Sequence, residues 1–122
     1  MAKTETITID RPIMVKSFDI HQNQTKRISL SQPGVFIAFL IVAGWKPGAY
    51  NYLAYLTGYS GSDANHHVTK LTDSFGSDAV QVTKVSGQYA WDVTYTSTDG
   101  VDIKLIILHI ENPNSLTIVQ ES

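Results

Sequence analysis

The apolar residues of the chain form short alternating runs and one longer continuous run. Residues 35–43 are all apolar, and they lie between the turn at Pro33 and Gly34 and a second turn sequence that ends at Gly48. A continuous apolar run of Val, Ile and Phe between turn-forming residues predicts a strand covered on both faces. The run is about half the roughly 20 residues of a membrane-spanning helix, so we expect it to be buried in protein.

A two-residue alternation of apolar and polar positions predicts further short strands. They cover residues 4–9, 12–18, 25–30, 49–59, 66–71, 79–85, 89–95, 101–110 and 115–120. Pro12 restricts the second of these to a strand start or a sheet edge. Residues 49–59 also fit a helical spacing, but their four tyrosines favour a strand. About eight to ten short strands separated by turns predict an all-β fold, an antiparallel β-sandwich of jelly-roll type.

Residues 105–108 form a second segment that is apolar on both faces. Two such segments in one small domain favour contact with another subunit, and cover by the protein's own loops is the alternative. The length of 122 residues predicts a single domain. Within it we expect residues 1–24 to be an N-terminal arm or the first strands, with a docking role, and residues 25–122 to form the sandwich head.

The composition narrows the class of partner. Charged residues make up 16% of the chain, below the roughly 25% of an average domain, and Thr, Ser, Gly and Tyr replace them, as in extracellular or virion-surface β proteins. A net charge of -2 and a pI near 6.0 argue against nucleic acid as a partner. Without cysteine, disulfides, thiolate zinc sites and thiol nucleophiles are excluded. The first residues lack the pattern of a signal peptide, so we expect synthesis in a cytoplasm and no membrane insertion.

Histidines and aspartates supply the candidate metal ligands. His66 and His67 are adjacent on a predicted strand, so they point to opposite faces, and we expect one to be exposed and the other packed against the sheet. Asp63, Asp73 and Asp78 flank that strand in two loops and could share a calcium ion. Loop aspartates more often bond their own backbone, and we favour that interpretation. We therefore predict no metal site and no cofactor.

No catalytic arrangement is evident. If the alternation of residues 101–110 persists, His109 faces the same side as Ile107, as a core residue or at a symmetric interface. It lacks a nucleophile partner, because no Gly-x-Ser-x-Gly sequence occurs. The glutamates also do not form an evident catalytic carboxylate pair. We therefore predict a protein that is not an enzyme, with no catalytic residues.

The aromatic residues after the apolar run are the candidate ligand site. Flat aromatic faces beside Asn and Asp side chains suit a carbohydrate, because they stack on its apolar faces while the polar groups bond its hydroxyls. Tyr55 belongs to the same aromatic group, and core packing is the alternative role for these side chains. The candidate ligand-binding residues are Trp45, Tyr50, Tyr52, Tyr59 and His66.

The order of these sequence features resembles the small β-sandwich head domains at the distal ends of bacteriophage fibres. The resemblance covers about residues 25–110 and is carried by the segments SLSQPGVFIAFLIVAGW, YSGSDANHHVTKL, AVQVTKVSGQYAWDVTY and VDIKLIILHI. It implies a homotrimer, intertwined or side by side, that is displayed on a virion and binds a glycan or a protein of the host surface. Fibre proteins usually carry a long shaft before the head, whereas only about 24 residues precede the resemblance here.

The resulting prediction is a non-enzymatic virion surface or fibre-tip module. We expect it to be made in the host cytoplasm, to form a homotrimer, and to bind a host receptor or another virion protein. Its binding would be multivalent, because a symmetric assembly presents several weak sites together. A carbohydrate-binding, lectin-like module is one alternative, and a glycan-active enzyme is another.

Overall fold

The described residues of the computed structural model form nine β-strands and one short 3-10 helix. The structure describes residues 3–6, 13–43, 51–76, 78–98 and 100–121. The strands are β1 (Met14–Ile20), β2 (Gln24–Leu30), β3 (Phe36–Ala43), β4 (Asn51–Gly58), β5 (His66–Asp73), β6 (Val80–Lys84), β7 (Ala90–Tyr95), β8 (Val101–Ile110) and β9 (Leu116–Gln120). The helix η1 (Pro113–Ser115) precedes β9.

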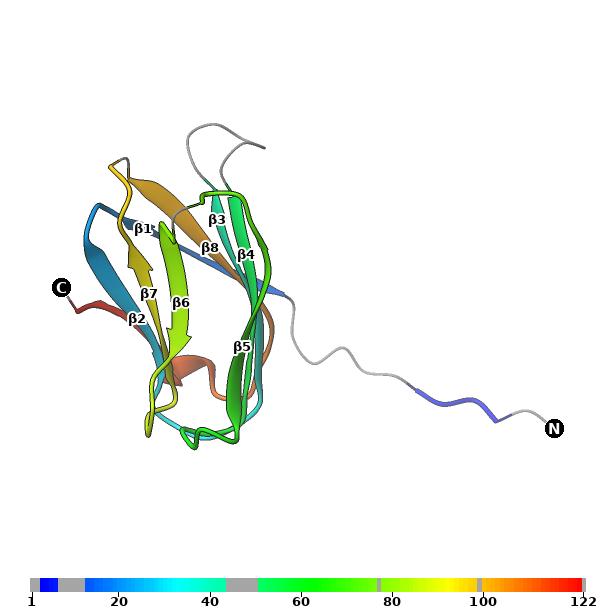
Figure 1. The fold of residues 1–122 in the computed structure, drawn as a ribbon. Helices are drawn as coiled ribbons and strands as arrows, with labels where there is room; N and C mark the ends of the chain where they lie inside the picture. Colours follow the sequence, from blue (N-terminus) through cyan, green and yellow to red (C-terminus); the bar gives the residue numbers. More distant parts are fainter. Residues whose placement is uncertain (1–2, 7–12, 44–50, 77, 99, 122) are drawn as a thin grey trace.

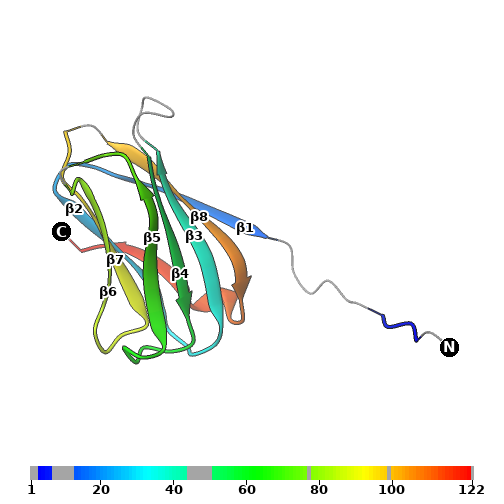
Figure 2. The same ribbon diagram turned by 45° about the vertical axis from the view of Figure 1, so that its right-hand side comes forward.

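Two antiparallel sheets pack face to face as a β-sandwich (Figures 1 and 2). The five-stranded sheet has the order β1-β8-β3-β4-β5, and the four-stranded sheet has the order β6-β7-β2-β9. The pairs β1 with β8 and β2 with β7 are nested, as in a long hairpin wrapped around a core, whereas β3, β4 and β5 form a meander. The all-β, jelly-roll-like sandwich expected from the sequence is therefore confirmed.

The core lies between the two sheets and is built from alternate residues of each strand. On β3, the side chains of Phe36, Ala38, Leu40 and Val42 are completely buried. They meet apolar side chains of the four-stranded sheet, and the ring centroids of Phe36 and Trp91 lie 5.5 Å apart. The residues between them on β3 point to the outer face of the sheet. The apolar run thus contributes one face to the core and one face to the outside.

A turn at Gly34 connects the two sheets just before β3. Gly34 has φ of 140°, which side chains rarely adopt, so glycine suits the Pro-Gly turn predicted there. Its N–H donates to the carbonyl oxygen of Tyr59 (2.8 Å), and its own carbonyl accepts from the buried hydroxyl of Tyr89 (2.7 Å). These bonds fix the start of β3 against both sheets.

Most strand predictions agree with the structure within two residues. Residues 51–58 form a strand and not a helix, and β1, which follows Pro12, lies at a sheet edge as predicted. Residues 3–6 are in no strand and lie away from the sandwich, and the rest of the strand expected at residues 4–9 falls outside the described residues (Figure 1). Residues 14–20, expected in the N-terminal arm or first strands, pair with β8.

The orientation expected for His109 is wrong. A register shift in the pairing of β3 with β8 makes Ile37 pair with His109 and Ala38 with Ile107. The extra residue of this β-bulge is Leu108, which is 41% exposed. Because a bulge interrupts the two-residue alternation, His109 lies on the exposed outer face, while Ile107 and Ile110 are buried.

Candidate functional site

The outer face of the five-stranded sheet carries a continuous row of apolar side chains. Cross-strand pairing aligns Val15 on β1 with Ile106 on β8, Ile106 with Phe39 on β3, and Phe39 with Tyr55 on β4. The row ends at Thr69 on the edge strand β5, which pairs with Tyr55. The Phe39 and Tyr55 rings lie 5.2 Å apart, a distance at which aromatic pairs attract.

The neighbouring rows extend this surface along the strands. In one direction Ile41 pairs with Leu53, and in the other Ile37 follows on β3. We call this surface the apolar face, and its members are Val15, Ile37, Phe39, Ile41, Leu53, Tyr55 and Ile106. Val15 is 57% exposed, and the other six are partly exposed in the single chain.

Polar residues limit the apolar face at both ends of the strands. At one end, Asp102 on β8 pairs with both Ala43 and Asp19. At the other end, Ile37 pairs with His109, and His67 lies across β4 from it. One charged residue lies within the surface: Lys104 pairs with Ile41, but its Nζ donates to the hydroxyl of Ser17 on the edge strand β1 (2.8 Å). Its charge is therefore held at the edge and not at the centre.

The outer face of the four-stranded sheet is mostly polar, and its exposed apolar exception is Val119 on the edge strand β9, which pairs with Arg27. Arg27 on β2 makes two bonds with Asp92 on β7: Nε donates to Oδ1 (2.8 Å) and Nη2 donates to Oδ2 (3.0 Å). This contact with Asp92 raises the pKa of the Arg27 guanidinium. Next to it, the hydroxyls of Thr25 and Thr94 lie 3.0 Å apart. Hydroxyl and ionic pairs of this kind suit a surface that faces water, so the two outer faces differ in chemistry.

The aromatic residues predicted as a ligand site are not gathered into one site by the described residues. Trp45 and Tyr50 lie outside the described residues. Tyr59 follows β4 and is 58% exposed, whereas Tyr52 and His66 are buried. Tyr52 pairs with Asp73 near one end of β4, and Gly58 pairs with His66 at the other end. Tyr52 and Tyr55 lie on opposite faces of β4, and both faces are apolar enough in sequence to be the core.

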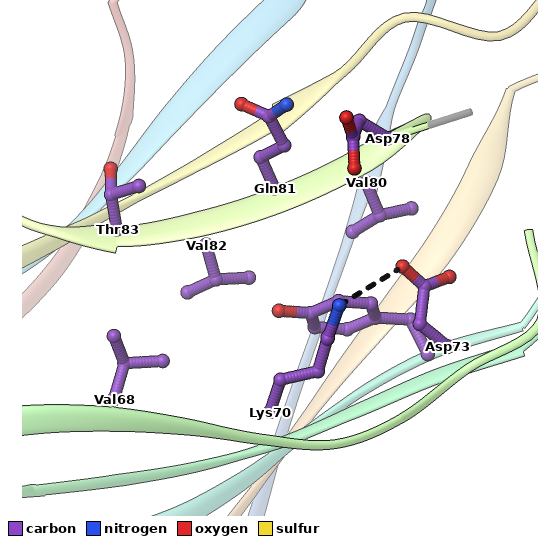
Figure 3. Close-up of a pocket in the computed structure, with 9 residues that line it drawn as sticks. Val68, Lys70, Asp73, Asp78, Val80, Gln81, Val82 and Thr83 are labelled. Atoms are coloured by element: carbon purple, nitrogen blue, oxygen red, sulfur yellow. Dashed lines mark ion pairs between the residues drawn. The ribbon is translucent and has the colours of Figure 1, made fainter. Parts of the chain in front are cut away.

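Tyr52 lines a cavity of about 330 Å³ between the edge strands β5 and β6. Figure 3 shows Val80 and Val82 pointing from β6 toward β5, while Gln81 and Thr83 point away. Lys70 and Asp73 form an ion pair at its rim, with 3.9 Å between Nζ and Oδ2. Burial, with a smaller effect from Asp73, raises the pKa of the Tyr52 hydroxyl. The residues lining this cavity are Tyr52, Val68, Lys70, Asp73, Asp78, Val80, Gln81, Val82 and Thr83.

His66 is a buried structural residue. Its Nδ1 lies 2.9 Å from the carbonyl oxygen of Ser62, and its Nε2 lies 3.2 Å from that of Val85. The edge of its ring packs on Trp91, with 5.5 Å between the ring centroids. Because carbonyl oxygens only accept, a neutral ring donates to one of them and a protonated ring donates to both. His67 is exposed, so the prediction of one packed and one exposed histidine is confirmed.

The candidate calcium ligands Asp63, Asp73 and Asp78 do not come together in one site among the described residues. Asp63 accepts from the Ser86 hydroxyl (2.9 Å), and this bond lowers the pKa of the Asp63 carboxyl. Asp73 accepts from the N–H of Phe75 (3.0 Å), which is the local loop bond expected from the sequence. Within the described ranges, no three His, Asp or Glu side chains are placed so that they could hold a metal ion.

β3 is predictable from the sequence, but the surface to which it contributes is not. Ile106 and Val15 belong to segments that were recognised as strands, yet their alignment with Phe39 depends on pairing between distant parts of the chain. The apolar segment at residues 105–108 is the feature of the sequence that could have indicated a place for Ile106 on the apolar face. In the part of the chain that the structure describes, no helix is long and apolar enough to cross a membrane.

Comparison with known proteins gives neither a family nor a function. No protein-family model matches the chain, and no curated protein matches its sequence. Among solved structures, the tailspike protein of Acinetobacter phage vB_ApiP_P1 aligns with 98% of this chain at a TM-score of 0.43 and 8% sequence identity. The chain spans 25% of the length of that tailspike chain. Similarity at this level carries no argument about function.

Proposed function

We propose that the chain is a non-enzymatic structural module of a virion surface or fibre tip, assembled as a homotrimer, that binds a host receptor or another virion protein. The proposed assembly is supported by the contrast between the apolar face of one sheet and the polar outer face of the other. The virion setting rests on the pattern that the sequence shares with fibre head domains.

The size of the apolar face supports an interface. Five strands about 4.8 Å apart are roughly 19 Å wide, and the residues from Ile37 to Ala43 extend for about 20 Å along β3, so the footprint is roughly 400 Å². The largest apolar patch on a typical monomer is about 300–600 Å² and is often functional, so a face of this size is a candidate interaction site. Burial of this surface against a partner stabilises the assembly by about 25 cal/mol for each Å² of apolar area that is removed from water.

The proposal that the protein is not an enzyme is supported by the contacts of the side chains whose chemistry would suit catalysis. Among the described residues, the Arg27–Asp92 and Lys70–Asp73 pairs are ion pairs between strand residues, and Asp63 is bonded to its neighbouring loop. His66 is enclosed by backbone carbonyls and aromatic rings. Each of these groups has a structural partner, so a role in binding and assembly fits them better than a role in catalysis.

Sedimentation equilibrium of the purified protein tests the proposal. The expected mass is three times 13.5 kDa over a range of micromolar concentrations. A mass of 13.5 kDa at every concentration, with the β-type circular dichroism of a folded chain, would overturn the assembly on which the proposed function depends.

A further inference from the structure

Both lateral edges of the apolar face carry exposed apolar side chains. β1 and β5 are the two edge strands of the five-stranded sheet. At the β1 edge, Ile13 and Val15 are 62% and 57% exposed, and at the β5 edge Leu71 is 52% exposed. Soluble proteins usually protect such edges with charges, prolines or cover from other elements, and here each edge strand also carries one exposed lysine, Lys16 on β1 and Lys70 on β5. Exposed apolar side chains therefore lie at both the β1 edge and the β5 edge of the apolar face.

This distribution suits a ring of identical subunits. In a cyclic assembly each contact is heterologous, so one side of a subunit meets the opposite side of its neighbour. When three copies place one sheet face each around a three-fold axis, the β1 edge of one copy adjoins the β5 edge of the next. Such an arrangement buries the centre of every face at the axis and covers both edges at once.

We infer that the apolar face lines a three-fold axis, with the β1 edge of each subunit against the β5 edge of the next copy. This inference rests on the proposed homotrimer and specifies the surfaces that meet. The occupant of the face is therefore a second and a third copy of this chain.

The charged groups of the face are compatible with this arrangement. Asp19 and Asp102 lie at one end of the strands, and His67 and His109 lie at the other, so they occupy the two open ends of the axis where water has access. The ammonium group of Lys104 is bonded to Ser17 at the β1 edge, away from the axis. The central row around Phe39 then consists of apolar side chains from all three subunits.

Cysteine cross-linking tests the arrangement directly, because the chain contains no cysteine. The double variant Val15→Cys/Thr69→Cys places one thiol at each end of the central row, and both positions are exposed in the single chain. A short bismaleimide tolerates more variation in geometry than a disulfide does. In the proposed ring it joins the thiol at position 15 of one subunit to the thiol at position 69 of the next, so denaturing gels should show covalent trimers with some dimers.

The controls separate this arrangement from others. Either single variant should remain monomeric on the gel, because equivalent edges of two subunits lie about 19 Å apart, the width of the sheet. The double variant Thr83→Cys/Thr117→Cys places exposed thiols on the two edge strands of the four-stranded sheet, and it should also remain monomeric.

The other outcomes overturn the inference in distinguishable ways. A trimeric mass without cross-links between positions 15 and 69 would remove this face from the axis and leave the homotrimer standing. Cross-linked dimers without trimers would indicate a two-fold pair. A wild-type protein that is monomeric at every concentration would overturn both the inference and the proposed function, and the apolar face would then belong to a different partner.

Discussion

The close contact between Gly58 and Tyr89 gives the sharpest test of how the two sheets are joined. A Cβ atom at position 58 would lie 2.5 Å from Cε1 of Tyr89 and 2.9 Å from its hydroxyl oxygen. Ordinary contact begins at 3.4 Å, so the ring in Gly58→Ala must move by about 1 Å. That movement breaks the bond from the Tyr89 hydroxyl to the carbonyl oxygen of Gly34, which is 2.7 Å long and buried.

The cost follows from these two effects. Loss of a buried hydrogen bond that leaves its acceptor unpaired costs about 1–3 kcal/mol. Overpacking of a closely packed site costs about 1–3 kcal/mol more. We therefore expect Gly58→Ala to lower the free energy of unfolding by about 2–6 kcal/mol and the melting temperature by about 10 °C or more. Urea unfolding measures the loss, and the subunit concentration must be held constant because assembly adds to apparent stability.

A matched variant and a double-mutant cycle isolate the cause. Gly87 has φ of 75° and open space around its Cβ position, so Gly87→Ala should cost only the backbone strain of about 1 kcal/mol. In a Tyr89→Leu background, which lacks the ring, the 3.0 Å approach to Cβ of His66 remains, and Gly58→Ala should cost only about 1 kcal/mol. An equal loss in both backgrounds would refute the steric explanation.

Two further predictions concern charge. Burial raises the pKa values of Tyr89 and Tyr52, so their contribution to stability is complete below the unfolded pKa of about 10 and is lost as the pH rises through the folded values. Urea midpoints should therefore fall as the pH is raised from about 8 to about 11, with a smaller fall in Tyr89→Phe; midpoints independent of pH would contradict this. Because about a quarter of each side chain is exposed, Arg27 and Asp92 should show a coupling energy of about 1 kcal/mol or less in a double-mutant cycle, decreasing in about 1 M salt. A coupling that salt leaves unchanged would contradict the electrostatic explanation.

Local patterns in the sequence were sufficient to predict the strands and the fold class. The alternation in residues 101–110 and the apolar run that contains Phe36 and Phe39 each identified a strand. The pairing of Val15 with Ile106, and of Ile106 with Phe39, joins positions that are far apart in the chain. Local periodicity does not encode which strand becomes the neighbour of another, so the row across the sheet could not be predicted.

One side-chain orientation was left open by the sequence and one was predicted wrongly, and both have physical causes. Both faces of β4 carry tyrosine and leucine, so the sequence did not indicate that Tyr52 faces the core and Tyr55 the outside. His109 was placed on the inner face because the alternation was extended through a bulge, and the unbroken apolar run at residues 105–108 conceals that bulge. The expectation that β3 has a second apolar face is confirmed, whereas contact of that face with another subunit stays a prediction.

The most direct test of the central claim is the mass of two matched variants measured by light scattering beside the wild type. Phe39→Lys puts a charge at the centre of the apolar face, where a single subunit lets it reach water because Phe39 is only partly buried. Thr94→Lys puts the same charge on a central strand of the polar sheet. We predict three times 13.5 kDa for the wild type and for Thr94→Lys, and 13.5 kDa for a folded Phe39→Lys. A trimeric Phe39→Lys, or a monomeric wild type, would contradict the claim that this face holds the assembly together.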